Sequence, residues 1–321
     1  MTAAAPTRPP ARRRAPRPIT AGTLLLADEP RVAERTDSLT AHIRATVDAG
    51  LRVLLTEQDT AGQADEPESV HQMRVAARRM RVALRMDRGG IGTAAETLRA
   101  ELSWLAGVLG AVRDLDVLCE RLAHDGADLP ENDLPAFAEV LSALLASREA
   151  AADVLAKSLA KPRYQALLQG LAAEARSAAD DGERIKPASL LIKPVRALHL
   201  QLVASAQSPS DDAWHMLRIR VKRVRYAADV AADLAGPKQR ARILALSKQA
   251  KAVQEVLGDF QDTVITEHHL RQLAAAHPGD LSAPALLVAG RLIERQVVKH
   301  AALRERLPAA TGELYRATTT D

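Results

Sequence analysis

The sequence has few aromatic residues, a single cysteine and no long apolar run. Only 2% of its 321 residues are aromatic, and strands favour aromatic and β-branched side chains, so the composition favours helices over sheets. The one cysteine, Cys119, excludes an intrachain disulfide framework and is typical of proteins from a reducing cytoplasm. No apolar segment approaches the roughly 20 residues of a transmembrane helix. We therefore expect a cytoplasmic, all-α protein without a membrane span.

Positive charge is distributed unevenly along the chain. The net charge is +4, but residues 1–18 contain five arginines, five prolines and no acid. Subtracting these five charges leaves −1 for the remaining residues, so the basic character of the folded part depends on where its charges are placed. A segment rich in proline and arginine cannot form a core, and we expect a disordered tail at 1–23.

Clusters of glycine, proline and aspartate divide the chain into long periodic segments. The segments expected to be helices are 32–57, 68–88, 93–124, 134–160, 163–179, 194–206, 212–234, 237–276 and 284–306. The break at 180–190 is the natural boundary between two halves. We expect a first helical bundle at 24–182, a second at 183–310 and a C-terminal tail at 311–321.

Two segments 144 residues apart share both their basic and their apolar positions. VHQMRVAARRMRVAL at 70–84 aligns with WHMLRIRVKRVRYAA at 214–228. Downstream, LGAVRDLDV at 109–117 aligns with LGDFQDTVI at 257–265. A chance match of two blocks in the same order is improbable, and it indicates an internal duplication of a helical bundle.

The basic residues of each repeat form a row, because residues three and four apart lie on one face of a helix. The rows are His71, Arg74, Arg78, Arg81 and Arg85 in the first repeat, and His215, Arg218, Lys222 and Arg225 in the second. An adjacent apolar stripe would pack against partner helices. No acid occurs between Val70 and Met86 or between Ala213 and Ala228, so neither row is neutralised within its own helix.

A row of one charge sign has two interpretations. Most charge runs are solvated faces, here bridged to acids on neighbouring helices. However, surface helices usually mix both signs, and like charges at i,i+4 repel by a few tenths of a kcal/mol per pair. If the surface binds an anion, the bound negative charge compensates this repulsion, which explains why both repeats contain a row of one sign. Arginine suits phosphate, because its planar guanidinium stays charged and can form paired hydrogen bonds.

Two parallel rows suit an extended polyanion better than a single phosphate. The chain has no glycine-rich phosphate loop, and only Trp214 and Tyr226 could stack nucleobases within the basic segments. We therefore expect phosphate without bases as the ligand. A helical scaffold that binds nucleic acid or an acidic protein partner is the alternative.

Some residues outside the rows are weaker candidates or have supporting roles. The weaker binding candidates are Lys248, Lys251, Arg148, Arg295 and Lys299. Asp114 and Asp262 occupy equivalent positions in the two halves, and we expect them to orient arginines through salt bridges. The face that contains Gly107 and Gly110 is expected to let a neighbouring backbone approach closely. In the second half, the equivalent face of Lys248, Lys251 and Asp262 is expected to point at a groove narrowed by Gly258.

No metal, cofactor or catalytic residue is expected. His268 and His269 are adjacent, so their side chains diverge by about 100° on a helix and cannot bind one ion together. His71 and His215 have no second histidine or carboxylate pair at i+3 or i+4, which helical metal sites usually contain; hydrogen bonding to phosphate or capping of the helix start is expected of them. A phosphohydrolase would need clustered carboxylates for a divalent metal, and those here are isolated.

The four motifs resemble those of the CHAD domain family, the "conserved histidine α-helical domain". The family signatures VHxxRVxxRRxR and LGxxRDxDV are similar to VHQMRVAARRMR and LGAVRDLDV, and LHxLRxxxKRxRY and LGxxQD to WHMLRIRVKRVRY and LGDFQD. The resemblance covers about residues 24–310, and four motifs in the same order make it specific. Trp214 stands where leucine is usual, which we expect to alter packing more than binding.

The resemblance implies two pseudo-symmetric four-helix bundles that together form one domain, with basic helices lining a central cavity. It also implies binding of inorganic polyphosphate, with polyphosphate granules and their proteins as the cellular setting. Carried over by motif, the polyphosphate contacts are His71, Arg74, Arg78, Arg79, Arg81, His215, Arg218, Lys222, Arg223 and Arg225. Members often accompany triphosphate-tunnel enzymes of the CYTH type. This chain lacks the ExExK strand motif of those enzymes, so we expect a stand-alone, non-enzymatic CHAD domain.

Overall fold

The protein is all-α, as predicted. A computed structural model describes residues 19–63, 66–178, 184–276 and 281–319, and these contain helices and connecting segments but no strand. The helices are α1 (Leu39–Glu57), α2 (Pro67–Arg85), α3 (Thr93–Asp125), α4 (Leu134–Leu159), α5 (Pro162–Arg176), α6 (Ile192–Gln207), α7 (Asp211–Leu234), α8 (Pro237–Ala276) and α9 (Ala283–Thr319), with short 3-10 helices η1 (Glu131–Asp133) and η2 (Pro187–Leu190). Within the described ranges, no helix is long and apolar enough to cross a bilayer.

The observed helices differ from the predicted ones mainly at the two ends of the chain. Residues 32–38 do not extend the first helix, because the Ser38 side chain accepts a hydrogen bond from the backbone N–H of Ala41 and starts α1 there. The expected tail at 311–321 is wrong up to Thr319, since α9 continues and buries Leu314 completely. Most of the tail expected at 1–23 lies outside the described residues.

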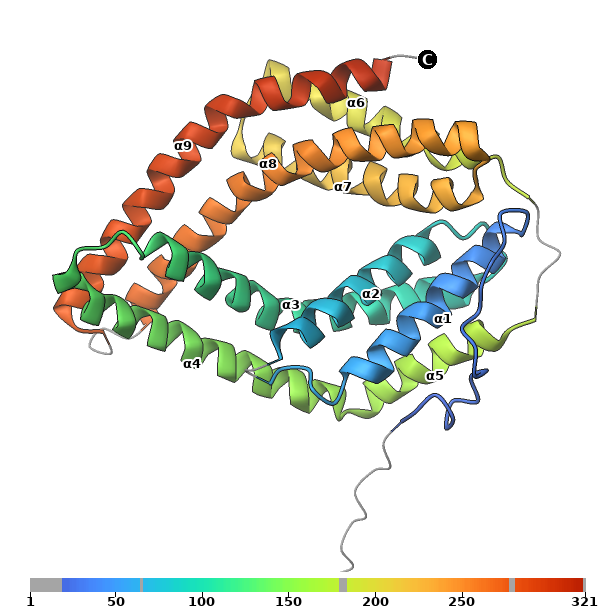
Figure 1. The fold of residues 1–321 in the computed structure, drawn as a ribbon, viewed down its shortest axis with the longest axis horizontal. Helices are drawn as coiled ribbons and strands as arrows, with labels where there is room; N and C mark the ends of the chain where they lie inside the picture. Colours follow the sequence, from blue (N-terminus) through green and yellow to red (C-terminus); the bar gives the residue numbers. More distant parts are fainter. Residues whose placement is uncertain (1–18, 64–65, 179–183, 277–280, 320–321) are drawn as a thin grey trace, which may run out of the picture.

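The helices are arranged as an elongated frame (Figure 1). The neighbouring helices α2 and α3 run along one side of this frame, and α7 and α8 run along the other. The two sides meet where α4 contacts α9 and, towards the other end, where α2 contacts α7. The two helices that carry the basic rows, α2 and α7, therefore lie on opposite sides of the frame and touch each other.

The buried apolar side chains of the described residues form three clusters. The largest packs α1, α2, α3 and α5 together with residues of α7 and α8, such as Ala231 and Ile243. A second joins the C-terminal part of α3 to α4, α8 and α9. A third packs α6, α7, α8 and α9 and contains the buried Trp214. Two of the clusters contain residues from both sides of the expected boundary at 182/183, so the two sides are packed against each other as one unit.

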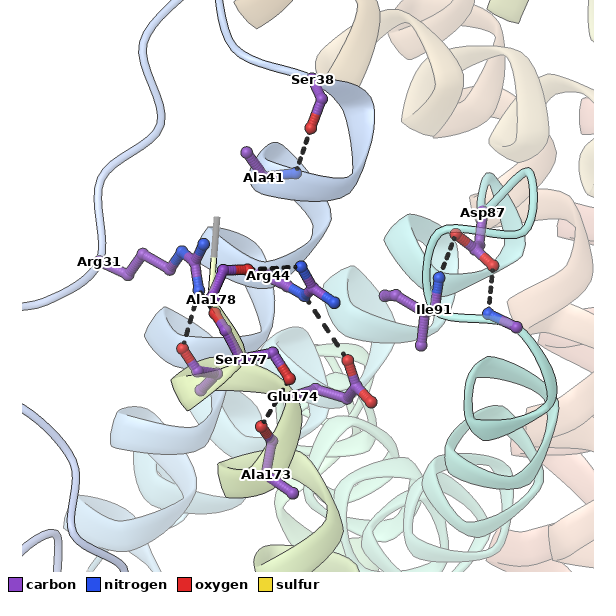
Figure 2. Close-up of polar contacts among 12 residues, drawn as sticks. Arg31, Ser38, Ala41, Arg44, Asp87, Ile91, Ala173, Glu174, Ser177 and Ala178 are labelled. Carbon is purple, nitrogen blue, oxygen red and sulfur yellow. Dashed lines mark hydrogen bonds and ion pairs between the residues drawn. The ribbon is translucent and has the colours of Figure 1, made fainter. Parts of the chain in front are cut away.

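The N-terminal segment before α1 is fixed across the end of α5 (Figure 2). A guanidinium nitrogen of Arg31, Nη1, donates to the backbone carbonyls of Ala175 at 3.0 Å and Ser177 at 2.7 Å. The backbone N–H of Arg31 donates to the buried carboxylate of Asp48 at 2.7 Å. These contacts satisfy carbonyls at the C-terminal end of α5, and they make this segment a fixed wall beside α1.

Candidate anion-binding site

The basic row of α2 lies beside its core-facing stripe, as the helical spacing predicted. Met73, Ala77 and Met80 are fully buried, whereas Arg74 and Arg78 are half-buried on the next face. The same division recurs on α7, where the buried apolar residues are Leu217, Val221 and Val224. Each helix thus uses one side for the core and the adjacent side for positive charge.

Cations from both helices converge on Lys222 of α7. Burial, followed by the charges of Arg218, Arg78 and Arg74, lowers the pKa of Lys222 from its usual 10.5 to about 8. Only Asp262 opposes this shift among the groups that act on it. Because Arg74 and Arg78 belong to α2 and Arg218 belongs to α7, the fold brings the two rows together at one place.

Tyr226 holds one arginine from each row. The guanidinium carbons of Arg78 and Arg225 each lie 5.3 Å from the centroid of its ring, within the range of cation–π contacts. Arg225 also donates from Nη1 to the side-chain oxygen of Gln254 on α8 at 3.1 Å. Burial and the charges of neighbouring arginines lower the pKa of Arg78, although a guanidinium keeps its proton in proteins.

Asp114 forms a salt bridge with an arginine of the first basic row. Its Oδ1 accepts a hydrogen bond from Nη1 of Arg74 at 2.7 Å. Nη1 of Arg74 also donates to the carbonyl oxygen of Gly110 at 3.4 Å. A Cβ added at Gly110 would lie only 3.3 Å from this nitrogen. Asp262 also pairs with an arginine, but the partner is Arg121 on α3. This pair links the two sides of the frame.

The expectation of close backbone approach at the glycine face of α3 is wrong. A Cβ placed at Gly107 would meet no atom within 4 Å, and at Gly110 the close neighbour is the guanidinium of Arg74 and not a backbone segment. A Cβ placed at Gly258 of α8 would likewise meet no atom within 4 Å.

A second group of cations lies near the C-terminal end of α2. Desolvation, followed by the charges of Arg99, Arg223 and Arg81, lowers the pKa of Arg85. This group joins α2, α3 and α7. The sequence motifs do not include Arg99. Its helical spacing from Gly110 and Asp114 places it on the same face of α3, and this spacing could have identified Arg99 as a further cation near the basic rows.

Most of these cations form no ion pair within the part of the chain that the structure describes. Within the described residues, no salt bridge is formed by Arg78, Arg79, Arg81, Arg85, Arg218, Lys222, Arg223 or Arg225. The Nε of Arg218 is buried and has no hydrogen-bond partner in the described part of the chain. A buried unsatisfied donor costs about 1–3 kcal/mol, and an anion placed beside it would offset that cost.

The two motif histidines differ in their surroundings. Nδ1 of His215 lies 2.8 Å from the side-chain oxygen of Gln261 on α8. His71 is half-buried and forms no hydrogen bond with the described residues. Neither caps its helix, because both lie beyond the first turn and the N-terminal cap of α7 is Ser210, whose hydroxyl accepts from the N–H of Ala213.

Two of the weaker candidates have structural roles instead. Arg148 is 5% exposed and pairs through Nε with Asp116 at 2.9 Å, while its other nitrogens donate to the carbonyls of Gly62 and Gln63. Arg295 donates to the carbonyl of Asp125 at the end of α3. Because their guanidiniums bind protein oxygens, we do not include them in the basic surface proposed below, and their role in anion binding stays a prediction.

The three weaker lysine candidates are exposed. Lys251 forms an ion pair of 3.7 Å with Glu255 on its own helix, whereas Lys248 and Lys299 make no polar contact with the described residues. Their role in binding stays a prediction. In the described ranges, no group of three histidine, cysteine, aspartate or glutamate side chains is placed to hold a metal ion.

Comparison with solved structures identifies similar folds. A CHAD domain from the plant Ricinus communis matches with a TM-score of 0.65 and 28% sequence identity, over 88% of this chain and 94% of that one. PptA from Streptomyces chartreusis matches with a TM-score of 0.64 and 19% identity, over 85% and 97% respectively. At 19% identity the likeness is one of fold alone.

Relatives by sequence include an uncharacterized protein of Mycobacterium tuberculosis strain CDC 1551 / Oshkosh. It is 31% identical over 273 residues, which are 81% of this chain and 50% of that protein. The chain thus spans about half the length of the curated relatives it matches. The CHAD domain profile itself matches residues 45–271, which include both basic rows and both aspartate motifs. The chain therefore belongs to the CHAD domain family.

Proposed function

We propose that this chain binds inorganic polyphosphate along the basic surface of α2 and α7 and does not catalyse a reaction on it. We define this basic surface as His71, Arg74, Arg78, Arg79, Arg81, Arg85, His215, Arg218, Lys222, Arg223 and Arg225. The observation that carries the proposal is the convergence of Arg74, Arg78 and Arg218 on the desolvated Lys222. In the family setting, the protein would act at polyphosphate granules or in phosphate storage.

The binding mechanism would be electrostatic and preorganised. Each charge-assisted hydrogen bond to a phosphate oxygen contributes about 1.5–3 kcal/mol before ordering costs. Asp114 and Tyr226 already hold Arg74, Arg78 and Arg225, so less side-chain entropy is lost on binding. A phosphate beside Lys222 would also favour its protonated form.

Nucleic acid and acidic proteins are the competing ligands. Non-specific binders of single strands stack bases on aromatic rings. Tyr226 is the aromatic residue beside the basic surface that could do so, but two guanidiniums lie over its ring. This arrangement favours a polyanion without bases.

Calorimetric titration with long-chain polyphosphate tests the proposal, with duplex and single-stranded DNA as competitors at equal phosphate concentration. We expect binding at moderate salt that DNA does not displace. The Arg78→Gln/Lys222→Gln variant should lose most of the affinity, whereas Lys238→Gln/Arg271→Gln removes the same charge at exposed positions on α8 and should retain it. Displacement by equimolar DNA phosphate would support the nucleic-acid alternative. Release of phosphate during incubation with magnesium would contradict the non-enzymatic part.

A further inference from the structure

An unassigned cavity of about 900 Å³ lies where α1, α2 and α7 meet the N-terminal segment. Much of its wall is apolar and is formed by Val53, Val75, Val82, Val230 and Leu244. Its volume falls in the range typical of small-molecule sites, which are mostly apolar with a few placed polar groups. The outer wall is the N-terminal segment, which Arg31 ties to the end of α5 (Figure 2).

The polar groups of this cavity carry both charge signs. Arginines from the N-terminal segment and three helices line the cavity, namely Arg31, Arg35, Arg78, Arg79, Arg225 and Arg240. Of these, Arg35, Arg79 and Arg240 are exposed and form no ion pair with the described residues. Two carboxylates of α7, Asp229 and Asp233, line the same cavity. The Ser247 hydroxyl donates to Asp229 at 3.4 Å, and Asp233 is exposed without a polar partner in the described part.

These surroundings specify three properties of a ligand. The arginines without ion pairs match an anionic group, for which phosphate is a good fit. The exposed carboxylates can accept hydrogen bonds from hydroxyl or amino donors on a ligand. The valines in the lining offer an apolar surface for the rest of the ligand. Linear polyphosphate offers only the first property, and an acyl phosphate lacks the donors.

We propose that this cavity binds a nucleoside phosphate. Its phosphates would lie against Arg79 and Arg240, its hydroxyl or amino groups would donate to Asp229 and Asp233, and its base would pack between the valines. This site is separate from the Lys222 centre of the basic surface, because neither Lys222 nor Arg218 lines the cavity.

The cavity and the basic surface share Arg78, Arg79 and Arg225. If both ligands draw on these charges, each reduces the affinity for the other by the same factor, because binding linkage is reciprocal. This coupling rests on the proposed function, whereas nucleotide binding itself does not.

Calorimetric titration of the full chain with ADP tests the site, with inorganic triphosphate and adenosine as separate probes. We expect ADP to bind more tightly than either probe, because each supplies only part of the required chemistry. Val230→Trp fills the cavity and should weaken ADP binding by about tenfold or more. If that variant misfolds, Arg35→Gln/Arg240→Gln changes only exposed side chains and should have a similar effect, with polyphosphate affinity unchanged.

The reciprocal control is Lys222→Gln, which should weaken polyphosphate binding and leave ADP affinity within about twofold. No ADP binding at millimolar concentration would overturn the nucleotide site while leaving the polyphosphate proposal intact. Equal affinity for ADP and triphosphate, with equal losses in Lys222→Gln, would also overturn it, because the basic surface alone would then explain both. ADP binding without polyphosphate binding would overturn only the proposed function.

Discussion

The guanidinium of Arg78 on α2 lies over the ring of Tyr226 on α7, 5.3 Å from its centroid. Arg225 lies over the same ring at the same distance, so one aromatic side chain holds a cation from each basic row. Cation–π contacts contribute about 0.5–2 kcal/mol depending on burial, which offsets part of the repulsion between the two arginines. Tyr226 therefore organises the contact between α2 and α7.

Replacing Tyr226 by leucine should weaken polyphosphate binding by about three- to tenfold, because Arg78 and Arg225 lose the ring that positions them. Tyr226→Phe keeps the ring and should retain the affinity. It should also keep or raise thermal stability, since the tyrosine hydroxyl is buried without a partner in the described part of the chain. Titration and thermal unfolding of both variants check this. Equal loss of affinity in the two would show that the hydroxyl, not the ring, matters.

Replacing Lys222 by methionine should stabilise the free protein and weaken anion binding. The lysine pKa is lowered by burial and by Arg218, Arg78 and Arg74, so its charge opposes folding at neutral pH. Removing it should raise the free energy of unfolding at pH 7 by on the order of 1 kcal/mol, after allowance for partial solvent exposure. Urea unfolding measures the change. Lys248→Met, at an exposed position on α8, is the control and should shift stability little.

Lys222→Met also tests how the lowered pKa of Lys222 makes the free energy of unfolding depend on pH. Between about pH 8 and the pKa of about 10.4 of an unfolded lysine, the unfolded chain binds more protons at Lys222 than the folded one. The contribution of Lys222 should therefore make the wild type more stable as pH rises through this window. The stability difference between wild type and Lys222→Met should shrink there. A constant difference from pH 7 to 10 would show that the pKa of Lys222 is not lowered.

Polyphosphate affinity should depend on pH through the same ammonium group. Above about pH 8 the free protein loses the Lys222 proton, and binding of the anion must restore it. Affinity for polyphosphate should fall by about tenfold between pH 7 and 9.5. Proton uptake on binding should appear as a difference in binding enthalpy between two buffers of different ionisation enthalpy. Lys222→Arg keeps its charge over this range, so its affinity should stay nearly flat. A parallel decline in both proteins would assign the effect to another group.

Arg148→Met should destabilise the fold and spare the anion site. The change leaves the buried carboxylate of Asp116 without its arginine, and breaking a buried pair costs about 3–5 kcal/mol. The double variant Arg148→Met/Asp116→Leu removes both charges and should recover part of the loss. Lys157→Met on the exposed side of α4 is the matched control. If the folded Arg148→Met variant bound polyphosphate more weakly than the wild type, Arg148 would belong to the anion-binding site.

Local periodicity explains what could be predicted from the sequence. The spacing of Arg74 and Arg78 beside Met73 and Ala77 placed charge and core on adjacent faces of one helix, and the structure confirms that division. The helical class followed in the same way from the long segments between glycine and proline clusters. The C-terminal limit was missed: α9 continues through Pro308, and the packing of Leu314 against distant helices decides where it ends.

Long-range pairing explains what could not be predicted. Arg74 and Arg148 are both arginines on helices, and the sequence alone does not distinguish their roles. Arg148 is buried and binds Asp116 and two loop carbonyls. Arg74 pairs with Asp114 and keeps part of its side chain exposed. Arg121 pairs with Asp262 across the frame, a contact that only the folding of α3 against α8 creates. The partners of an arginine are set by tertiary contacts, which spacing along one helix does not contain.

The salt dependence of polyphosphate binding tests the central claim most directly. Binding to a linear polyanion weakens linearly on a log–log plot of affinity against salt, with a slope set by the number of phosphates that protein cations neutralise. The wild type should show a steep slope, and Arg78→Gln/Lys222→Gln should reduce that slope by about 2 while its unfolding temperature stays the same or rises. An unchanged slope and affinity in this variant would show that the convergent cations of α2 and α7 do not contact the anion.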